Sequence, residues 1–519
     1  MSESAVTLII LGLAVIAFIS GKIPTGIVAL AVSLALLATG VLDLPQAFAG
    51  FADPAVVLIA ALFVVSEGLD ASGLTAWTGR LLVQRGGGNP VVLTVLVMVV
   101  VAILSALVSP NGAVAALLPV VVVVATRIKV APAWLLLPLA FGAHSGALLT
   151  LTGSPVNVLI SEYAADAAGR PFGFFEFAIV GVPLVIGSIL ITALFGRRLI
   201  PARTPATISR DLSDHARVLL RDYPTAAEAA VDKDSGVVEV LVAPRSAFVG
   251  EKVFPGMVTD SGELVVLAIS RAGENLEDRE VALRAGDVLV LRGTWEALDR
   301  NLPDPNVVVV DQPDDVRRQA APLGWRAWTA LGILIAMVVL LATGVWPPAV
   351  TGLVAACAMV LTRVVTVQRA HRSINWTTLL LVAGMIPMST AITQTGTAAT
   401  IANGLVDAVG DSGPTMVLLA LCAVALVFGQ LISNTATALI LAPIAVSIAT
   451  ALGLSPLPFL MAVAVVCAAA FITPVATPAN FLVMGPAGLK FGDYWKLGLP
   501  LMLLFLAVAV FLVPVIWPY

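Results

Sequence analysis

Charge is scarce in this sequence. Asp, Glu, Lys and Arg together make up 12% of its 519 residues, and aromatic residues make up 6%. Hydrophobic residues reach 59%, and the mean hydropathy is +1.02. A soluble protein of this length does not need so many apolar residues. The composition therefore predicts a polytopic membrane protein surrounded by lipid, and no nucleic-acid partner is expected.

Cysteine is also rare, with three residues in the whole chain. Cys357, Cys422 and Cys467 lie in apolar segments without the spacing of a disulfide or a metal site, so we interpret them as packing residues. The apolar segments contain no metal-ligand cluster, nucleophile–base set or acid pair. We therefore do not expect an enzyme.

The few charges are unevenly distributed. Residues 202–322 contain 21 of the 32 acidic and 14 of the 28 basic residues, which leaves 11 acidic and 14 basic residues for the rest of the chain. This segregation predicts a soluble insert at 202–322 between two membrane segments, 1–201 and 323–519.

Apolar stretches of transmembrane length occur in both membrane segments. In the first segment they fall near 5–21, 24–42, 54–73, 133–165 and 177–196, and in the second near 327–345, 348–365, 376–394, 457–489 and 497–516. The stretches at 133–165 and 457–489 contain internal prolines, which predict broken helices.

Two further apolar tracts, at about 90–127 and 414–450, are too long for one helix. Each has small polar residues in its middle, Ser109-Pro110-Asn111-Gly112 in one and Ser433-Asn434-Thr435 in the other. Polar groups in hydrocarbon cost several kcal/mol each unless a partner satisfies them. Two apolar helices joined by a polar tip predict a re-entrant hairpin in each tract.

Four landmarks recur in the two membrane segments at nearly one spacing. Pro155 and Asn157 in GSPVN correspond to Pro478 and Asn480 in ATPAN, 323 residues later. The other two pairs are Gly73 with Gly396, also 323 apart, and Pro119 with Pro443, 324 apart. The coincidence predicts an internal repeat.

Each predicted repeat has five crossings and one hairpin, and an odd number of crossings makes the repeats inverted. With the N-terminus outside, thirteen basic residues face the cytoplasm and Arg170 alone faces out, as the positive-inside rule requires. The cytoplasmic residues are Lys22, Arg80, Arg85, Arg127, Lys129, Arg197, Arg198, Arg326, Arg363, Arg369, Arg372, Lys490 and Lys496.

The predicted fold is thus an all-α polytopic membrane protein with an inverted repeat of five transmembrane helices plus one re-entrant hairpin each, and a small α/β insert. We expect it in the cell (inner) membrane, with both termini outside and the insert at 202–322 in the cytoplasm.

The predicted tips and breaks combine two kinds of binding chemistry. Prolines free backbone carbonyls, and these with Ser, Thr and Asn oxygens are hard ligands for an alkali cation. The helix N-termini that follow each break suit an anion. Since each repeat supplies one tip and one break, we expect two cation sites flanking one anion site. We also expect the Ser433-Asn434-Thr435 tip to face the break from Thr473 to Asn480.

The insert carries strand-like segments at 237–243, 264–269 and 287–292, followed by a short helix at 294–301. Residues 236–303 resemble the TrkA C-terminal domain, most specifically in LRAGDVLVLRG at 283–293. The resemblance implies a regulatory domain that often dimerises and takes a nucleotide. A passive domain without a ligand is an equal alternative.

The membrane part resembles the divalent anion:sodium symporter family of the ion transporter superfamily, through the SNT tip, the TPxN break and the paired hairpins. The resemblance implies a homodimer, an elevator motion, Na+ as the coupling ion, and a dicarboxylate, tricarboxylate or sulfate as substrate. A permease joined to a TrkA C-terminal domain also resembles sulfate permeases of this superfamily, which favours sulfate.

The same resemblance assigns residues to the sites. The implied substrate-binding residues are Ser109, Asn111, Gly112, Ser154, Pro155, Asn157, Ser433, Asn434, Thr435, Thr477, Pro478 and Asn480. One implied sodium site comprises Ser109, Asn111, Thr152 and Gly153, and the other comprises Ser433, Asn434, Thr473 and Ala476. The first tip departs from the family pattern, because SPNG replaces SNT.

Two other functions are open at this point. A proton-coupled or exchange transporter would need His144, Glu67 or Asp70 to titrate. A ligand-gated ion channel would use the insert as its sensor.

Overall fold

This computed structural model describes two units, one made of Met1–Ile208 with Arg326–Tyr519 and one made of Ser209–Trp325. Within them, the described residues are 2–20, 22–74, 89–128, 130–203, 235–243, 246–259, 261–271, 274–276, 280–302, 306–309, 324–409, 413–474 and 476–519. Arg80, Arg85 and Lys129, which the sequence places in the cytoplasm, lie outside these ranges.

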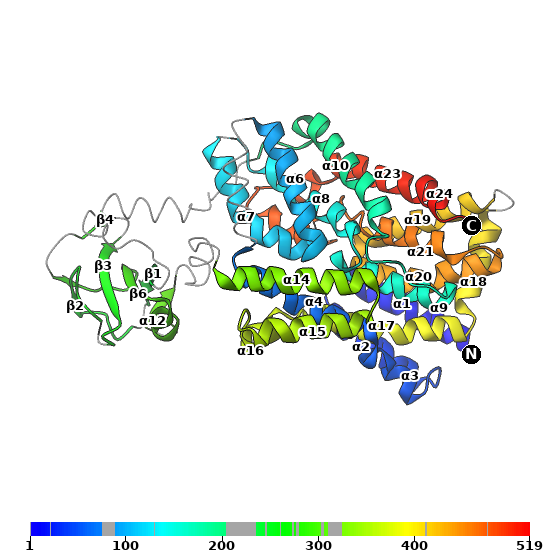
Figure 1. Cartoon of the computed structure of the whole chain (residues 1–519), viewed down its shortest axis with the longest axis horizontal. Coiled ribbons are helices and arrows are strands. Elements are labelled where there is room, and N and C mark those ends of the chain that lie inside the picture. The colour runs from blue at the N-terminus through cyan, green and yellow to red at the C-terminus, as the bar shows by residue number, and fades with distance from the viewer. Residues whose placement is uncertain are drawn as a thin grey trace. The chain divides into compact units, whose positions relative to one another are not determined.

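The first unit is helical (Figure 1). Its first half consists of α1 (Glu3–Ser20), α2 (Thr25–Ala38), α3 (Leu44–Phe48), η1 (Ala49–Ala52), α4 (Pro54–Ala71), α6 (Pro90–Leu107), α7 (Pro110–Arg127), α8 (Ala133–Gly146), η2 (Ala147–Leu149), η3 (Leu151–Gly153), α9 (Pro155–Ala168) and α10 (Ala178–Leu199).

The second half begins at α14 (Trp325–Thr343) and runs to the C-terminus. It continues with α15 (Pro348–Leu361), α16 (Val367–Ser373), α17 (Trp376–Gln394), α18 (Thr397–Val409), α19 (Pro414–Leu431), α20 (Asn434–Ala451), α21 (Pro456–Cys467), α22 (Pro478–Met484), η5 (Phe491–Asp493), α23 (Trp495–Ala507), a π-helical turn (Val508–Leu512) and α24 (Val513–Ile516).

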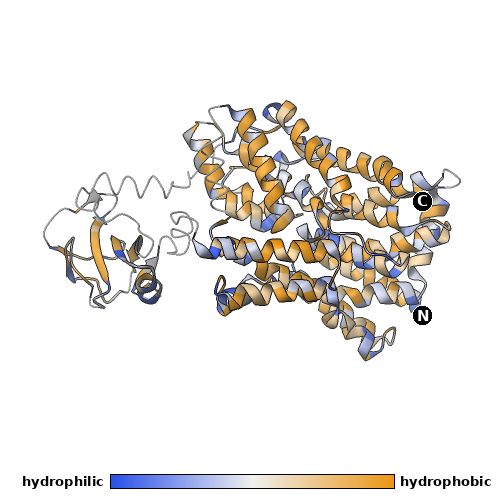
Figure 2. Cartoon of the chain, viewed as in Figure 1, coloured by the Kyte–Doolittle hydropathy of each residue, from blue (hydrophilic) through white to orange (hydrophobic). Residues whose placement is uncertain are grey.

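Nine helices in the described part of the chain are long and apolar enough to cross a membrane. Figure 2 shows that apolar residues dominate these helices, and large apolar side chains such as Leu194 and Phe511 are exposed on them. The membrane character predicted from composition is therefore confirmed.

Many of these helices begin at a polar cap followed by proline. Pro lacks an N–H and is pre-set for the first helical turn, while the preceding oxygen accepts from a free backbone N–H. The pairs are Asp53-Pro54, Asn89-Pro90, Ser109-Pro110, Ser154-Pro155, Ser455-Pro456 and Thr477-Pro478. This local chemistry fixes where α7, α9 and α22 begin.

Small residues let α8 lie directly against α6. A Cβ on Gly146 would come within 2.3 Å of the Ala102 Cα and 2.4 Å of the Ala102 carbonyl oxygen. One turn away, the Ser105 Oγ donates to the Ala143 carbonyl at 2.6 Å. Close backbone approach of this kind is typical of membrane helix packing.

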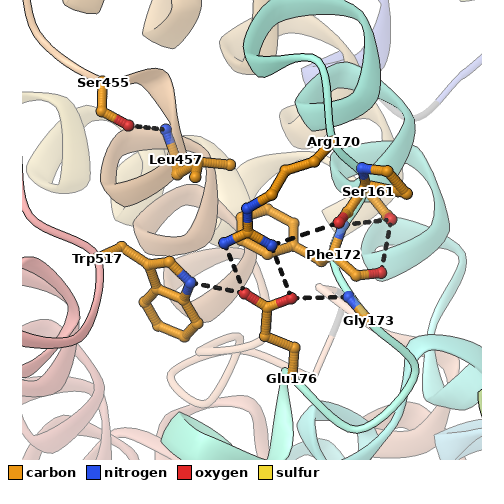
Figure 3. Close-up of polar contacts among 9 residues, drawn as sticks. Ser161, Arg170, Phe172, Gly173, Glu176, Ser455, Leu457 and Trp517 are labelled. Carbon is orange, nitrogen blue, oxygen red and sulfur yellow. Dashed lines mark hydrogen bonds and ion pairs between the residues drawn. The ribbon is translucent and has the colours of Figure 1, made fainter.

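The loop between α9 and α10 is fixed by hydrogen bonds and holds the C-terminal end of the chain (Figure 3). Arg170 pairs with Glu176, and the Gly173 N–H donates to the same carboxylate at 2.7 Å. The indole N–H of Trp517 also donates to Glu176, at 2.7 Å. Segments 341 residues apart are therefore joined through one carboxylate.

The insert forms a five-stranded antiparallel sheet in the order β4-β3-β6-β1-β7. The strands are β1 (Ser235–Val242), β3 (Leu264–Arg271), β4 (Glu274–Asn275), β6 (Val288–Thr294) and β7 (Val307–Val309), with a separate pair β2 (Lys252–Val253) and β5 (Val281–Ala282) and a helix α12 (Trp295–Asn301). The three strands and the helix predicted from the sequence are all present.

A buried ion pair joins β3 to the turn before β6. The Arg271 Nε and Nη2 donate to Asp287 at 2.7 and 2.8 Å, and the Arg284 N–H donates to it at 2.7 Å. The Asp287 side chain is 1% exposed. The hydrogen bonds from Arg271 are the main reason that the pKa of Asp287 is lowered, although burial opposes them.

Replacing Asp287 with asparagine is expected to destabilise the insert by about 2 kcal/mol, because the hydrogen bonds from Arg271 and Arg284 lose their charged acceptor. Since the folded-state pKa of Asp287 is lowered, its contribution is complete above about pH 4 and is lost as the pH falls through the lowered value. Hydrogen exchange of β3 and β6 in the full-length protein measures the effect. The exposed pair Lys252–Glu280 is the control, and Glu280→Gln should change stability by about 0.5 kcal/mol or less. Equal effects of the two changes would contradict the prediction.

Candidate functional site

Two helical hairpins carry the polar tips predicted from the sequence. Ser109 lies between α6 and α7, and its Oγ accepts from the Gly112 N–H at 3.3 Å. Ser433 lies between α19 and α20, and its Oγ accepts from the Ala436 N–H at 3.3 Å. Each tip serine is therefore the N-cap of the helix that follows it.

Two broken helices face these hairpins, and an asparagine holds each break in the same way. The Asn157 Nδ2 donates to the carbonyls of Ala147 and Thr150, both at 2.8 Å. The Asn480 Nδ2 donates to the carbonyls of Ala470 and Thr473, at 2.7 and 3.1 Å. All three residues differ by 323 between the halves, so this geometry is duplicated. The amide replaces hydrogen bonds that the interrupted helix cannot make.

Each break is also tied to the hairpin of its own half. The Thr150 hydroxyl donates to the Ala106 carbonyl at 2.5 Å, and the Thr473 hydroxyl donates to the Gln430 carbonyl at 3.2 Å. The Gln430 side chain adds two bonds, to the Ala469 carbonyl and from the Ile472 N–H. The second hairpin therefore reaches its own break through Gln430, three residues before the predicted tip.

The structure adds contacts between halves that the sequence did not indicate. The Asn111 Oδ1 accepts from the Ala479 N–H at 3.1 Å, so the first tip lies at the start of α22. The His144 Nε2, on α8, is 3.2 Å from the Asn480 Oδ1 and 3.0 Å from the Thr477 Oγ1. The first tip thus meets the second break as well as its own.

The second tip meets the first break at a cavity of about 20 Å³. Its lining residues are Pro110, His144, Ala147, Leu148, Ser154, Val156, Asn157, Asn434, Ala464 and Ala468. A space of this size holds about one water molecule or small ion. The lining includes the first turns of α7, α9 and α20 and contains no charged side chain among the described residues.

Two buried amide oxygens at this cavity have no partner in the described part of the chain. They are the Oδ1 atoms of Asn157 and Asn434. Asn157 is 1% exposed. Buried polar atoms normally have a partner, so these two oxygens mark a place for a bound group.

The remaining predicted residues lie close to this centre or in the second break. Pro155 and Pro478 are the first residues of α9 and α22. Thr152 and Gly153 lie in η3, where a Cβ on Gly153 would come within 2.3 Å of the Ala147 carbonyl oxygen. The other predicted residues are Ser154 and Thr477, which cap α9 and α22, Thr435 in the first turn of α20, and Ala476 in the second break.

Sequence reasoning missed two residues that support the site. The Tyr494 hydroxyl donates to the Asn480 carbonyl at 2.7 Å, and Gln430 holds the second break as described above. His144 was expected to be an interhelical hydrogen-bond partner rather than a proton relay, and it does join the two halves. A glutamine three residues before the tip serine was a usable signal for Gln430. Glu67 and Asp70, the other proposed proton carriers, lie on α4 and do not line the cavity.

Comparisons with known proteins identify the class. The chain is 30% identical to the uncharacterized transporter YfbS of Escherichia coli (strain K12), over 98% of each chain. The YdaH transporter of Alcanivorax borkumensis, a solved structure, shares the fold with a TM-score of 0.51 and 17% identity, over 93% of this chain and 89% of that one. The fold and these matches define an integral membrane transport protein.

Its family follows from a family model. The citrate transporter (CitMHS) model matches residues 15–453 and 408–519, so the chain belongs to the citrate transporter family. A more distant relative is sodium/sulfate cotransporter 2 of Chlamydomonas reinhardtii, which is 25% identical over 53% of this chain and 32% of that protein.

Proposed function

We propose that this protein is a sodium-coupled secondary active transporter, a symporter of a small divalent anion, within the divalent anion:sodium group of its superfamily. Sulfate is favoured over a C4-dicarboxylate. The observation that carries the proposal is the meeting of the starts of α7, α9 and α20 at a cavity whose described lining is uncharged. The Oδ1 atoms of Asn157 and Asn434, which line it, have no partner among the described residues.

Helix starts suit an anion because their backbone N–H groups and dipoles present partial positive charge. No Lys or Arg is among the described residues that line the cavity. A dianion bound beside these helix starts would be expensive without a compensating positive charge. A cation that binds with the substrate supplies this charge, which is the physical reason for proposing symport.

Similarity supports the choice of ion and substrate without fixing it. A relative named as a sodium/sulfate cotransporter agrees with sodium and sulfate. The family description, citrate transporter, favours a carboxylate as the alternative. The hydroxyl, amide and backbone groups of the tips and breaks could hydrogen-bond either kind of anion.

We also propose the larger architecture that the sequence predicts. It consists of an inverted repeat, re-entrant hairpins, a homodimer, an elevator-type motion, and outward-facing termini with a cytoplasmic insert. The duplicated bonds of Asn157 and Asn480 support the repeat. We further propose that the insert, resembling a TrkA C-terminal domain, regulates transport through a nucleotide.

Uptake of labelled sulfate and succinate into proteoliposomes tests the function. We expect an inward sodium gradient to increase the initial uptake rate of sulfate or succinate by about tenfold or more, compared with an equal choline gradient. The reason is that the cation offsets buried negative charge. Adding nucleotides on the side of the insert in the same assay tests regulation. Absence of sodium dependence for sulfate, succinate and citrate alike would reject the proposal.

Proton-coupled transport is the second candidate, and the position of His144 favours it. This imidazole lines the cavity and contacts both Thr477 and Asn480. This candidate would be supported if uptake in sodium-free buffer is driven by a pH gradient and if His144→Gln makes that uptake independent of pH.

The remaining candidate is a ligand-gated ion channel. Single-channel currents would support it.

A further inference from the structure

The two break asparagines differ in one respect that matters for ion binding. Both donate two hydrogen bonds through Nδ2, so the orientation of each amide is fixed and each Oδ1 is an acceptor. The Asn480 Oδ1 has the His144 Nε2 at 3.2 Å, and since Oδ1 can only accept, this nitrogen donates. The Asn157 Oδ1 has no partner in the described part of the chain.

The sequence explains this difference. The residue that corresponds to His144 at a spacing of 323 is Cys467, which is completely buried at the end of α21. A thiol is a much weaker donor than an imidazole N–H. The repeat therefore satisfies the break oxygen in one half and leaves its counterpart without a strong donor.

The tip asparagines show the same asymmetry. The Asn111 Oδ1 accepts from the Ala479 N–H, which begins α22. The corresponding N–H in the first break belongs to Val156, and it donates to the Ser154 Oγ at 3.2 Å. The Asn434 Oδ1, which would be its counterpart, has no partner among the described residues.

The two unsatisfied oxygens belong to one place, because Asn157 and Asn434 both line the 20 Å³ cavity. Ser154, with a third oxygen, lines it too. Neutral hard oxygens suit an alkali cation, and the absence of a carboxylate from the described lining argues against Ca²⁺ or Mg²⁺.

We infer that Asn157 of the first break and Asn434 of the second tip form one site for a single monovalent cation, which the other tip–break pair cannot duplicate because its amide oxygens are already bonded. The choice of sodium rests on the proposed function. This arrangement differs from the two sites, one per half, that the sequence predicted.

Sodium binding to the full-length protein in detergent tests the inference without transport. The probe is ²²Na⁺ in choline buffer free of sulfate and carboxylates, together with the thermal shift produced by NaCl. We expect one saturable ion per chain, and Asn434→Ala should raise the sodium Kd by about tenfold or more, since it removes one bond to a charged group. A stoichiometry of two, or an unchanged Kd in Asn434→Ala, would overturn the inference. So would a wild-type protein that binds no sodium, the result expected if water alone occupies the cavity.

The repeat offers a sharper pair of variants at Cys467. Cys467→His would place an imidazole where His144 lies in the other half, so that its N–H bonds to the Asn157 Oδ1 and excludes the cation. Sodium binding should then fall by about tenfold or more, whereas Cys467→Ser, a small change at the same position, should keep it within about twofold. If the larger side chain prevents folding, as judged by size-exclusion chromatography, the Asn434→Ala result decides.

Failure of this inference can be separated from failure of the proposed function. If the protein binds one sodium ion more weakly after Asn434→Ala but shows no sodium-driven anion uptake, symport is rejected and the proposed cation site stands. If uptake is driven by sodium but Asn434→Ala does not change the sodium affinity, the proposed cation site is rejected and symport stands.

Discussion

Replacing Asn480 with alanine is expected to abolish anion uptake and to destabilise the membrane unit by about 3–5 kcal/mol. The side chain is completely buried and donates to the carbonyls of Ala470 and Thr473 while accepting from His144. Its removal leaves the Ala470 and Thr473 carbonyls without this donor, and each unsatisfied buried group costs about 1–3 kcal/mol. The His144 imidazole also loses one of its two contacts and keeps the one to Thr477. Thermal unfolding in detergent and uptake by proteoliposomes measure the two effects.

Asn157→Ala is the matched control for this prediction, because the chain contains the same asparagine twice. Asn157 makes the same two Nδ2 bonds, but its Oδ1 has no partner in the described part of the chain. In sodium-free buffer we expect Asn157→Ala to be the milder change by about 1–2 kcal/mol, the value of the bond from His144. If Asn157→Ala is the more damaging of the two, the assigned role of the His144 bond is wrong.

Replacing Gly146 with leucine is expected to prevent stable folding, and alanine at this position should cost about 3 kcal/mol or more. A Cβ here would lie 2.3 Å from the Ala102 Cα, and backbone cannot move aside as a side chain does. Helix α8 would have to leave α6, which would break the bond from Ser105 to Ala143 and displace His144. Yield of monodisperse protein and the unfolding temperature measure the change.

Gly332→Ala provides the control for this prediction. Gly332 lies within α14, and a Cβ there would meet nothing within 4 Å. Alanine should be neutral or stabilise the helix by about 1 kcal/mol, because glycine disfavours helices. Equal loss of stability in the two variants would contradict the packing argument.

The sequence predicted the helices and the strands of this protein with good accuracy, because their signals are local. Long apolar stretches predicted membrane helices, and internal prolines predicted the breaks that precede α9 and α22. In the insert, alternation and glycine punctuation predicted β1, β3 and β6. Family resemblance predicted a divalent anion:sodium symporter. The family model shows the broader assignment, the citrate transporter family.

By itself the sequence also indicated Ser154, Asn157 and Asn434 of the cavity lining, since polar residues in apolar segments and a spacing of 323 are visible without a structure. Only the tertiary structure decided how those residues are paired. The bonds from Ala479 to Asn111 and between His144 and Asn480 join positions 368 and 336 residues apart. No local preference encodes such contacts, because they depend on how α7, α8 and α22 pack together. Packing likewise decided which amide oxygens have no partner among the described residues, and so where we propose that a cation binds.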